Sequence, residues 1–344
     1  MSLPSTMRSF LLTGQGDLGQ LEFRDDVPVP VPREDEVLVK VSACGVNNTD
    51  INTRTGWYGD AGWGGGLTFP RIQGADPVGR IVEAGSGVKR SRIGERVMID
   101  AWIRPPDGNL DGSEYLGSER DGGFADYVTV PSINAYPIET DMTDVELASL
   151  PCSYATAEHM LHRAAVRTGQ WVLVTGASGG VGSALIQLAR RRGARVIAVT
   201  SPSKMRAVED LGAEVVLDRS AADLADSVMA ASSGGVDVLA DVVGGELFPV
   251  LLKAVRRGGH YTTAGAVGGA IVSLDLRTLY LHDLTMHGAT VLPPEVFANL
   301  IGYIERGEIR PLVAATYPLE ELREAQESFM QRKHIGSIVI EVSE

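Results

Sequence analysis

A glycine-rich turn is the strongest chemical signal in the sequence, with Gly176, Gly179, Gly180 and Gly182 in one short segment. An apolar run at 171–175 precedes it, and a segment with a helical apolar stripe follows it. Glycines at a strand-to-helix turn allow a tight bend and let backbone N–H groups approach a pyrophosphate, and the helix N-terminus favours the anion. The pattern therefore predicts a dinucleotide site. The residues expected at the cofactor here are Gly176, Ser178, Gly179, Gly180 and Val181.

The end of the next predicted strand, at 195–200, bears on which dinucleotide is bound. NAD sites usually place Asp or Glu there to bind the ribose hydroxyls, whereas this chain has Thr200. Ser201 can donate a hydrogen bond to a 2′-phosphate, Lys204 adds positive charge one turn further on, and Arg219 could reach the same phosphate or cover the adenine. We expect NADP rather than NAD, mainly because the acid is missing. The alternative is that Lys204 and Arg219 are ordinary solvated charges.

Two further segments, 241–245 and 263–266, end predicted strands at the carboxyl edge of the sheet. Ligands of open α/β sheets bind outside that edge. We expect both segments to line the ribose next to the nicotinamide. The cofactor residues assigned to them are Val243, Gly244, Ala264, Gly265 and Ala266.

The histidines and cysteines argue against a catalytic metal in the N-terminal part of the chain. All six histidines follow residue 150, and the two cysteines are Cys44 and Cys152. A catalytic zinc needs about three N, S or O protein ligands. An unusual set of Asp50, Asp76 and Cys152 is conceivable, but we expect no metal and expect Cys152 to be a small buried residue.

The predicted elements divide the chain into two kinds of structure. Up to about residue 136, short strands alternate with Gly and Pro turns, which is typical of a small β-barrel or sandwich. From about residue 143, strands and helices alternate, which indicates a parallel sheet with helices on both faces. The expected strands are 36–41, 79–84, 96–99, 171–175, 195–200, 214–218, 237–243, 259–264 and 338–342, and the expected helices are 144–150, 156–166, 180–192, 202–211, 221–231, 246–256, 295–306 and 319–332.

Charge and composition exclude several classes of partner. The formal net charge is −13, which disfavours nucleic acid and anionic membrane surfaces. Two cysteines cannot build a disulfide framework. The first residues lack the pattern of a signal peptide, and no apolar stretch is long enough to span a bilayer. We therefore expect a cytoplasmic protein without nucleic-acid or membrane partners.

Several motifs together resemble the medium-chain dehydrogenase/reductase superfamily over nearly the whole length. They are 43–50 (ACGVNNTD), 74–79 (GADPVG), 94–97 (GERV), 121–128 (DGGFADYV) and the glycine-rich turn. The resemblance implies an α/β fold in which a GroES-like β-barrel domain, formed by both chain ends, carries an inserted Rossmann domain with a doubly wound parallel sheet. The expected domains are 1–145 with 310–344 (GroES-like, catalytic) and 146–309 (NADP-binding).

Within the superfamily, the chain is most similar to the zinc-independent quinone oxidoreductase branch. Asn47 and Ala75 stand where the zinc enzymes have Cys and His ligands, and only Cys152 matches a zinc-ligand position. A saturated carbonyl develops full alkoxide charge on reduction, which needs strong donors. A quinone or enone spreads that charge, so the missing zinc favours conjugated acceptors.

The resemblance also implies the catalytic residues. Asn47 would lie near the nicotinamide and bond either the substrate carbonyl or the cofactor carboxamide. Thr49 matches a hydroxyl that passes protons, and Tyr58 matches a substrate-site tyrosine, while a second such tyrosine is Asn52 here. The alternative is that Asn47 and Thr49 only cap a turn or helix.

Two more cofactor contacts and one loop follow from the resemblance. Thr156 matches a threonine that packs on the nicotinamide ring, and Ser337 replaces a lysine that reaches the cofactor. The loop at 56–69, with its glycine cluster at 62–66, is either a lid over an apolar substrate or a filler between strands.

These observations predict a homodimeric, zinc-independent oxidoreductase that transfers hydride from NADPH to a quinone or α,β-unsaturated carbonyl. The resemblance places the dimer contact at the sheet edge around 273–291. One alternative is an alcohol or aldehyde dehydrogenase of the same superfamily. Another is a catalytically idle NADPH-binding or structural protein.

Overall fold

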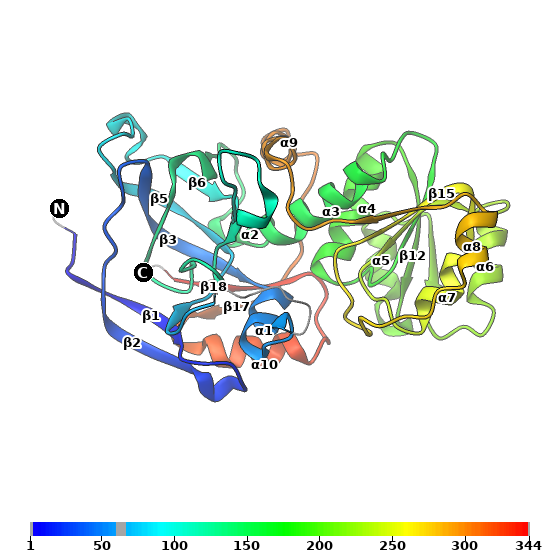
Figure 1. The fold of residues 1–344 in the computed structure, drawn as a ribbon, viewed down its shortest axis with the longest axis horizontal. Helices are drawn as coiled ribbons and strands as arrows, with labels where there is room; N and C mark the ends of the chain where they lie inside the picture. Colours follow the sequence, from blue (N-terminus) through cyan, green and yellow to red (C-terminus); the bar gives the residue numbers. More distant parts are fainter. Residues whose placement is uncertain (1–2, 60–66, 343–344) are drawn as a thin grey trace. The chain divides into compact units, whose positions relative to one another are not determined.

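The computed structural model describes residues 3–59 and 67–342, which form two compact units (Figure 1). Unit 1 comprises Met1–Cys152, Ile304–Arg306 and Arg310–Glu344. Unit 2 comprises Ser153–Tyr303 and Gly307–Ile309. The predicted glycine cluster at 62–66 lies outside the described residues, so the role of the 56–69 loop stays a prediction.

Unit 1 is built on strands from both ends of the chain. Its largest sheet has the order β10-β6-β5-β3-β18-β17, and β9 also pairs with β3. The predicted strand at the C-terminus, β18, pairs antiparallel with β3 and so rejoins the first unit. A second sheet has the order β2-β1-β4, and β7 pairs with β8. The bounds are β1 Thr6–Leu12, β2 Leu21–Pro28, β3 Glu36–Val46, β4 Arg71–Ile72, β5 Asp76–Ala84, β6 Arg96–Ile99, β7 Trp102–Ile103, β8 Glu114–Tyr115, β9 Tyr127–Pro131, β10 Ala135–Pro137, β17 Val313–Pro318 and β18 Ser337–Glu341.

The core of unit 1 lies between these strands and a few short helices. Fully buried Phe124, Leu38 and Leu322 belong to the same apolar cluster, although they are far apart in sequence. The C-terminal segment is thus part of this core and not an appendage. The helices of this unit are α1 Asn48–Thr55, α2 Asp144–Ala148 and α10 Leu322–Met330.

Unit 2 is a six-stranded parallel sheet in the order β13-β12-β11-β14-β15-β16, with helices arranged around it (Figure 1). Strands β11 and β14 are buried along their whole length, as expected for central strands of a parallel sheet. Its strands are β11 Trp171–Val174, β12 Arg195–Thr200, β13 Val215–Asp218, β14 Val236–Asp241, β15 Val255–Thr263 and β16 Thr285–Gly288. The helices are α3 Pro151–Arg163, which starts in unit 1, α4 Gly180–Arg191, α5 Met205–Asp210, α6 Leu224–Ala231, α7 Leu247–Leu252, α8 Leu276–Leu281 and α9 Pro294–Glu305, which ends in unit 1.

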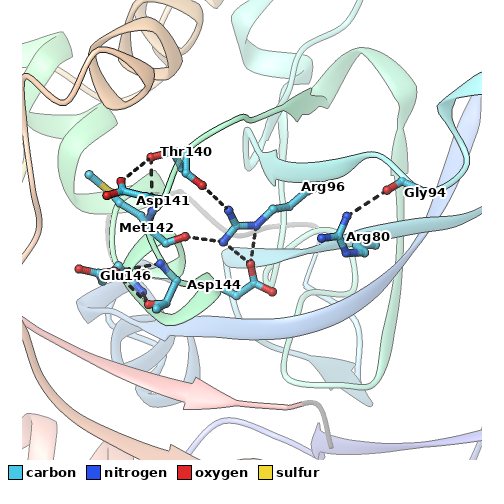
Figure 2. A network of polar contacts seen from close by, with 9 residues as sticks. Arg80, Gly94, Arg96, Thr140, Asp141, Met142, Asp144 and Glu146 are labelled. Carbon is cyan, nitrogen blue, oxygen red and sulfur yellow. Dashed lines mark hydrogen bonds and ion pairs between the residues drawn. The ribbon is translucent and has the colours of Figure 1, made fainter.

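The boundary between the units differs from the predicted one, because residues 146–152 and 304–306 belong to unit 1. Arg96 of β6 holds the segment that leads into α2 (Figure 2). Its guanidinium donates to the Asp144 carboxylate at 2.6 Å and to the Met142 carbonyl at 2.7 Å. Helix α2 is therefore tied to the barrel strands, a long-range contact that the change from strand to helix pattern could not reveal.

The predicted helix at 246–256 is wrong in its second half. Helix α7 ends at Leu252, and Val255 begins β15 by pairing with Val236. Buried Leu251, Leu252, Ala254 and Val255 continue an apolar pattern that fits both structures. These residues form a strand and not a helix because they pair with the central sheet, and such tertiary contacts often determine the structure of short apolar runs.

Candidate active site

The glycine-rich turn of unit 2 joins β11 to α4 as predicted. Gly176 has φ +59°, and a Cβ on Gly182 would lie 2.2 Å from the Gly176 carbonyl oxygen. Both positions therefore need glycine, since a side chain would strain the backbone or collide with it. The N–H groups in the first turn of α4 have no acceptor within the helix, which makes this turn suited to a pyrophosphate. Ser178, Gly179, Gly180 and Val181 are all half-buried, so a ligand can reach them.

The predicted 2′-phosphate residues come together at the ends of β12 and β13. The Arg219 N–H donates to the Thr200 carbonyl at 2.9 Å, which fixes the chain next to the strand end. Burial and, second, the positive charge of Arg219 lower the pKa of Lys204, so the two cations lie near each other. Ser201 is half-buried beside them, and its hydroxyl lies 3.4 Å from that of Ser203. The nearby Asp218 carboxylate already accepts from the N–H and hydroxyl of Ser220.

A buried carboxylate that the sequence analysis did not single out organises the next turn. Asp241, the last residue of β14, accepts from the Thr175 hydroxyl at 2.5 Å and the Tyr261 hydroxyl at 3.1 Å. It also accepts from the N–H groups of Val243 at 2.9 Å and Gly244 at 3.2 Å. Asp241 thus ties together the ends of three neighbouring strands and shapes the predicted cofactor turn. Its position directly before the Val-Val-Gly-Gly turn is the signal that could have identified it.

The second predicted turn lies against the first. The Val267 N–H donates to the Val242 carbonyl at 3.2 Å, and the Gly268 N–H donates to the Val243 carbonyl at 2.8 Å. Within the turn, the Thr263 hydroxyl donates to the Gly265 carbonyl at 3.1 Å. Residues Ala264, Gly265 and Ala266 therefore lie at the same edge of the sheet as Val243 and Gly244.

In unit 1, Asn47 precedes α1 and is held by two carboxylates. Its backbone N–H donates to Asp50 Oδ2 at 2.8 Å, and its side-chain Nδ2 donates to Asp76 Oδ2 at 2.9 Å. Nδ2 also lies 3.4 Å from the Gly45 carbonyl. The other oxygen of Asp76 accepts from the Cys152 N–H at 2.9 Å. The NH₂ group of Asn47 is therefore engaged within the protein, and Asn47 also forms a capping box with Asp50 at the start of α1, as the alternative of a helix cap predicts.

The two carboxyl groups at this position are buried, and burial raises the pKa of both. Burial raises the pKa of Asp50 to about 7, against the opposing effect of the hydrogen bonds from the Asn47 and Gly74 N–H groups. Burial and the neighbouring Asp50 charge raise the pKa of Asp76 well above its ordinary value, against the Asn47 hydrogen bond. The site can therefore hold a proton near neutral pH.

A hydroxyl cluster lies beside this acidic pair. The Asn52 side chain donates to the Tyr58 hydroxyl at 3.2 Å, and the Thr49 hydroxyl interacts with the same phenol. Burial raises the pKa of Tyr58, with Cys152 near enough to contribute. Tyr115 also interacts with the Cys152 side chain, and no pattern in the 104–122 segment predicts this contact.

The donor set in unit 1 does not fit a catalytic zinc. Ala75 is fully buried and has no ligand atom, and the Asn47 amide is bonded to Asp76. In the described residues 3–59 and 67–342, no group of three His, Cys, Asp or Glu side chains could hold a metal ion. The unusual set of Asp50, Asp76 and Cys152 is thus not assembled as a metal site.

The two remaining predicted cofactor residues lie in different units. Thr156 is half-buried in α3, within unit 2. Ser337 begins β18 in unit 1 and is 9% exposed, with its hydroxyl 3.5 Å from the Ser149 carbonyl.

Comparisons with known proteins identify both halves of the chain. Residues 33–140 match the model for the alcohol dehydrogenase GroES-like domain, and residues 180–306 match the model for the zinc-binding dehydrogenase. The chain is 30% identical to an alcohol dehydrogenase of Geobacillus stearothermophilus, with 94% of this chain and 96% of the relative covered. It is 29% identical to the quinone oxidoreductase of Rattus norvegicus, with 94% of each chain covered.

Solved structures agree with these relatives. A protein of Sinorhizobium meliloti 1021, described provisionally as an alcohol dehydrogenase, is 50% identical with a TM-score of 0.95, over 99% of this chain and 98% of the other. The 2-octenoyl-CoA carboxylase reductase CinF, solved with NADP and 2-octenoyl-CoA, is 25% identical with a TM-score of 0.89, over 99% of this chain and 88% of the other. Among the described residues, no helix of this chain has the length and apolar character needed to cross a membrane.

Proposed function

Because this chain belongs to the medium-chain dehydrogenase/reductase superfamily and is an oxidoreductase of that family, we propose that it transfers hydride from NADPH to a quinone or an α,β-unsaturated carbonyl without a catalytic zinc. The observation that carries this proposal is the substitution of two of the three zinc-ligand positions, Asn47 and Ala75, with only Cys152 retained. The amide NH₂ group of Asn47 donates a hydrogen bond to Asp76, and the Ala75 side chain has no atom that could bind zinc. No group in this arrangement can act as a Lewis acid on a carbonyl.

This absence favours acceptors whose charge is spread by conjugation. The bound nicotinamide supplies the hydride, and the protein supplies position and hydrogen bonds. Reduction of a saturated ketone or aldehyde puts full negative charge on one oxygen, which requires strong donors. Hydroxyl donors such as Thr49 and Tyr58 suffice for an enolate or a hydroquinone monoanion, in which the charge is delocalised.

Each side chain of the unit 1 site then has a separate role. The Tyr58 and Thr49 hydroxyls hydrogen-bond the carbonyl oxygen of the substrate. The Asn47 amide oxygen accepts from the carboxamide of the cofactor, which is the one of its two predicted partners that suits an acceptor atom. Asp76 fixes that amide orientation, and the buried acidic pair keeps a proton near the site at neutral pH.

Preference for NADPH is supported by the groups around the end of β12. Thr200 brings no carboxylate, and Lys204 and Arg219 lie near each other. Two cations suit a 2′-phosphate with a charge of about −2 at neutral pH. CinF, which binds NADP and an unsaturated thioester, shares the fold and supports the same pairing of cofactor and substrate class.

We also propose that the protein is a homodimer joined at β16. This strand is the last in its sheet and has no partner on its outer side among the described strands. Leu276, Tyr280 and Leu281 of the preceding helix are 64%, 63% and 52% exposed. An open strand edge next to exposed apolar side chains is suited to pairing with a second copy.

A second candidate is oxidation of an alcohol, which the name of the Geobacillus relative favours. The deciding experiment measures oxidation of NADPH and NADH with quinones, enones and saturated aldehydes, with and without a chelator. We expect turnover with NADPH and conjugated acceptors and no effect of the chelator. Chelator-sensitive turnover of saturated aldehydes would establish the second candidate, and NADPH binding without turnover of any acceptor would favour an idle binding protein.

A further inference from the structure

Arg54 in α1 differs from the other arginines that are withdrawn from solvent. It is 2% exposed, and in the described part of the chain no carboxylate lies at ion-pair distance from it. A buried charge is normally paired, because removing it from water is costly. The half-buried arginines 71, 104, 120 and 192 pair with Asp121, Asp100, Glu36 and Glu158, respectively.

The partners of Arg54 are all neutral. Its Nη1 donates to the Gly16 carbonyl at 2.8 Å, its Nε to Gln326 Oε1 at 3.0 Å, and its Nη2 to the Met330 sulfur at 3.6 Å. A guanidinium has five N–H groups, so these contacts leave donors on both Nη atoms. Burial lowers the pKa of Arg54, and Asp17 opposes this only through a weaker long-range attraction.

Arg54 lines an open groove in unit 1. The groove has a volume of about 680 Å³ and is formed by residues 16–19, Arg54, Thr55 and Met330. Next to the guanidinium, the Nε2 of fully buried Gln326 has no hydrogen-bond partner. The groove thus contains a guanidinium that has no ion-pair partner, contributed by α1, and the Met330 side chain, contributed by α10, while Gln326 lies buried behind Arg54.

We propose that this groove binds a small monocarboxylate through Arg54. A carboxylate matches the two Nη groups in geometry and supplies the missing charge. One cation with Asp17 at the rim suits a monoanion better than a dianion such as phosphate. Leu18 and Met330 provide apolar walls for a short hydrocarbon body. The occupant is therefore of the short-chain fatty acid class.

The test uses the exposed residue Thr55, which lines the groove and takes no part in the proposed catalysis. Thr55→Glu places a carboxylate beside Arg54 and competes with the ligand, while Thr55→Gln is a matched neutral control. Calorimetric titration of the intact protein uses butanoate as the probe and inorganic phosphate for comparison. We expect saturable butanoate binding that Thr55→Glu weakens at least about tenfold and Thr55→Gln changes by less than about twofold.

Three results would overturn the proposal. They are no saturable binding of butanoate, equal affinity of the two Thr55 variants, and phosphate binding as tight as butanoate binding. Arg54→Met should abolish binding as well. If that variant does not fold, the Thr55 pair still decides, because both substitutions are at the surface and leave Arg54 in place.

Discussion

The candidate residues of the two units differ in the kind of group that they offer. In unit 2 the turns predicted to bind the cofactor offer backbone groups, and glycines such as Gly176 and Gly182 allow their conformation and close packing. In unit 1 the site is formed by side chains, since Asn47, Asp76 and Cys152 meet only through tertiary structure. A backbone site tolerates few substitutions at its glycines, whereas a side-chain site can lose a metal ligand and keep its shape.

This difference bears on the proposal that this chain works without a catalytic zinc. The Asp76 carboxylate takes hydrogen bonds from the Asn47 amide and the Cys152 N–H, so both of its oxygens are satisfied. A buried carboxylate whose two oxygens each accept a hydrogen bond has no oxygen left without a partner. The cofactor turn offers no comparable replacement, because its contacts come from main-chain N–H groups.

The largest effect is expected from Gly182→Ala. The added Cβ would lie 2.2 Å from the Gly176 carbonyl oxygen, so the turn must move and the pyrophosphate site is lost. We expect NADPH affinity to fall by about a hundredfold or more. The matched control is Gly288→Ala in the same unit, whose Cβ would meet no atom within 4 Å and which is not among the expected cofactor residues. Fluorescence titration of both variants checks this, and equal loss in both would refute the steric argument.

Asp76→Asn should have the next largest effect and should act on turnover. The new NH₂ group would face either the Asn47 amide or the Cys152 N–H, so Asn47 must turn. We expect kcat with a quinone to fall about ten- to hundredfold, while NADPH affinity changes little, because misplacement of a positioning group costs rate.

The control for this substitution is Asp100→Asn. Asp100 is an equally buried carboxylate of unit 1 that accepts from Arg104 and from the Trp102 N–H. The Asp100→Asn variant should have a lower melting temperature than the unchanged protein but the same kcat. If kcat falls equally in the two variants, Asp76 contributes to the stability of the fold and does not position Asn47.

The sequence predicts the glycine-rich turn between β11 and α4 but not the contacts around Asn47, for a physical reason. Gly176 and its neighbours act within a few residues, so their spacing carries the signal. Asn47 and Asp76 are 29 residues apart, and Asp76 and Cys152 are 76 residues apart, so their meeting depends on the barrel register. Tyr115 comes from a segment without a regular pattern.

Lys204→Ala should have a smaller, selective effect on the cofactor. The side chain lies near Arg219 and is expected to contact the 2′-phosphate, which NADH lacks. We expect NADPH affinity to fall about tenfold and NADH affinity to change by less than about twofold. Arg219→Ala should show the same direction if both cations bind that phosphate. Parallel titrations with the two cofactors measure this, and equal loss for both would remove the 2′-phosphate assignment.

The pH dependence of stability gives a test that is independent of cofactor binding and turnover. Burial raises the pKa of Asp50 from 3.8 to about 7, so between these values the folded chain holds a proton that the unfolded chain has released. The stabilisation is complete below about pH 4 and is lost as the pH rises through about 7, by at most about 1.4 kcal/mol per pH unit. Asp50→Asn should flatten the slope of unfolding free energy in this window. Asp275→Asn should not, because the pKa of exposed Asp275 is about 2, below the window. Urea unfolding at a series of pH values compares them, and an unchanged slope in Asp50→Asn would show that this carboxyl is ionised in the folded protein.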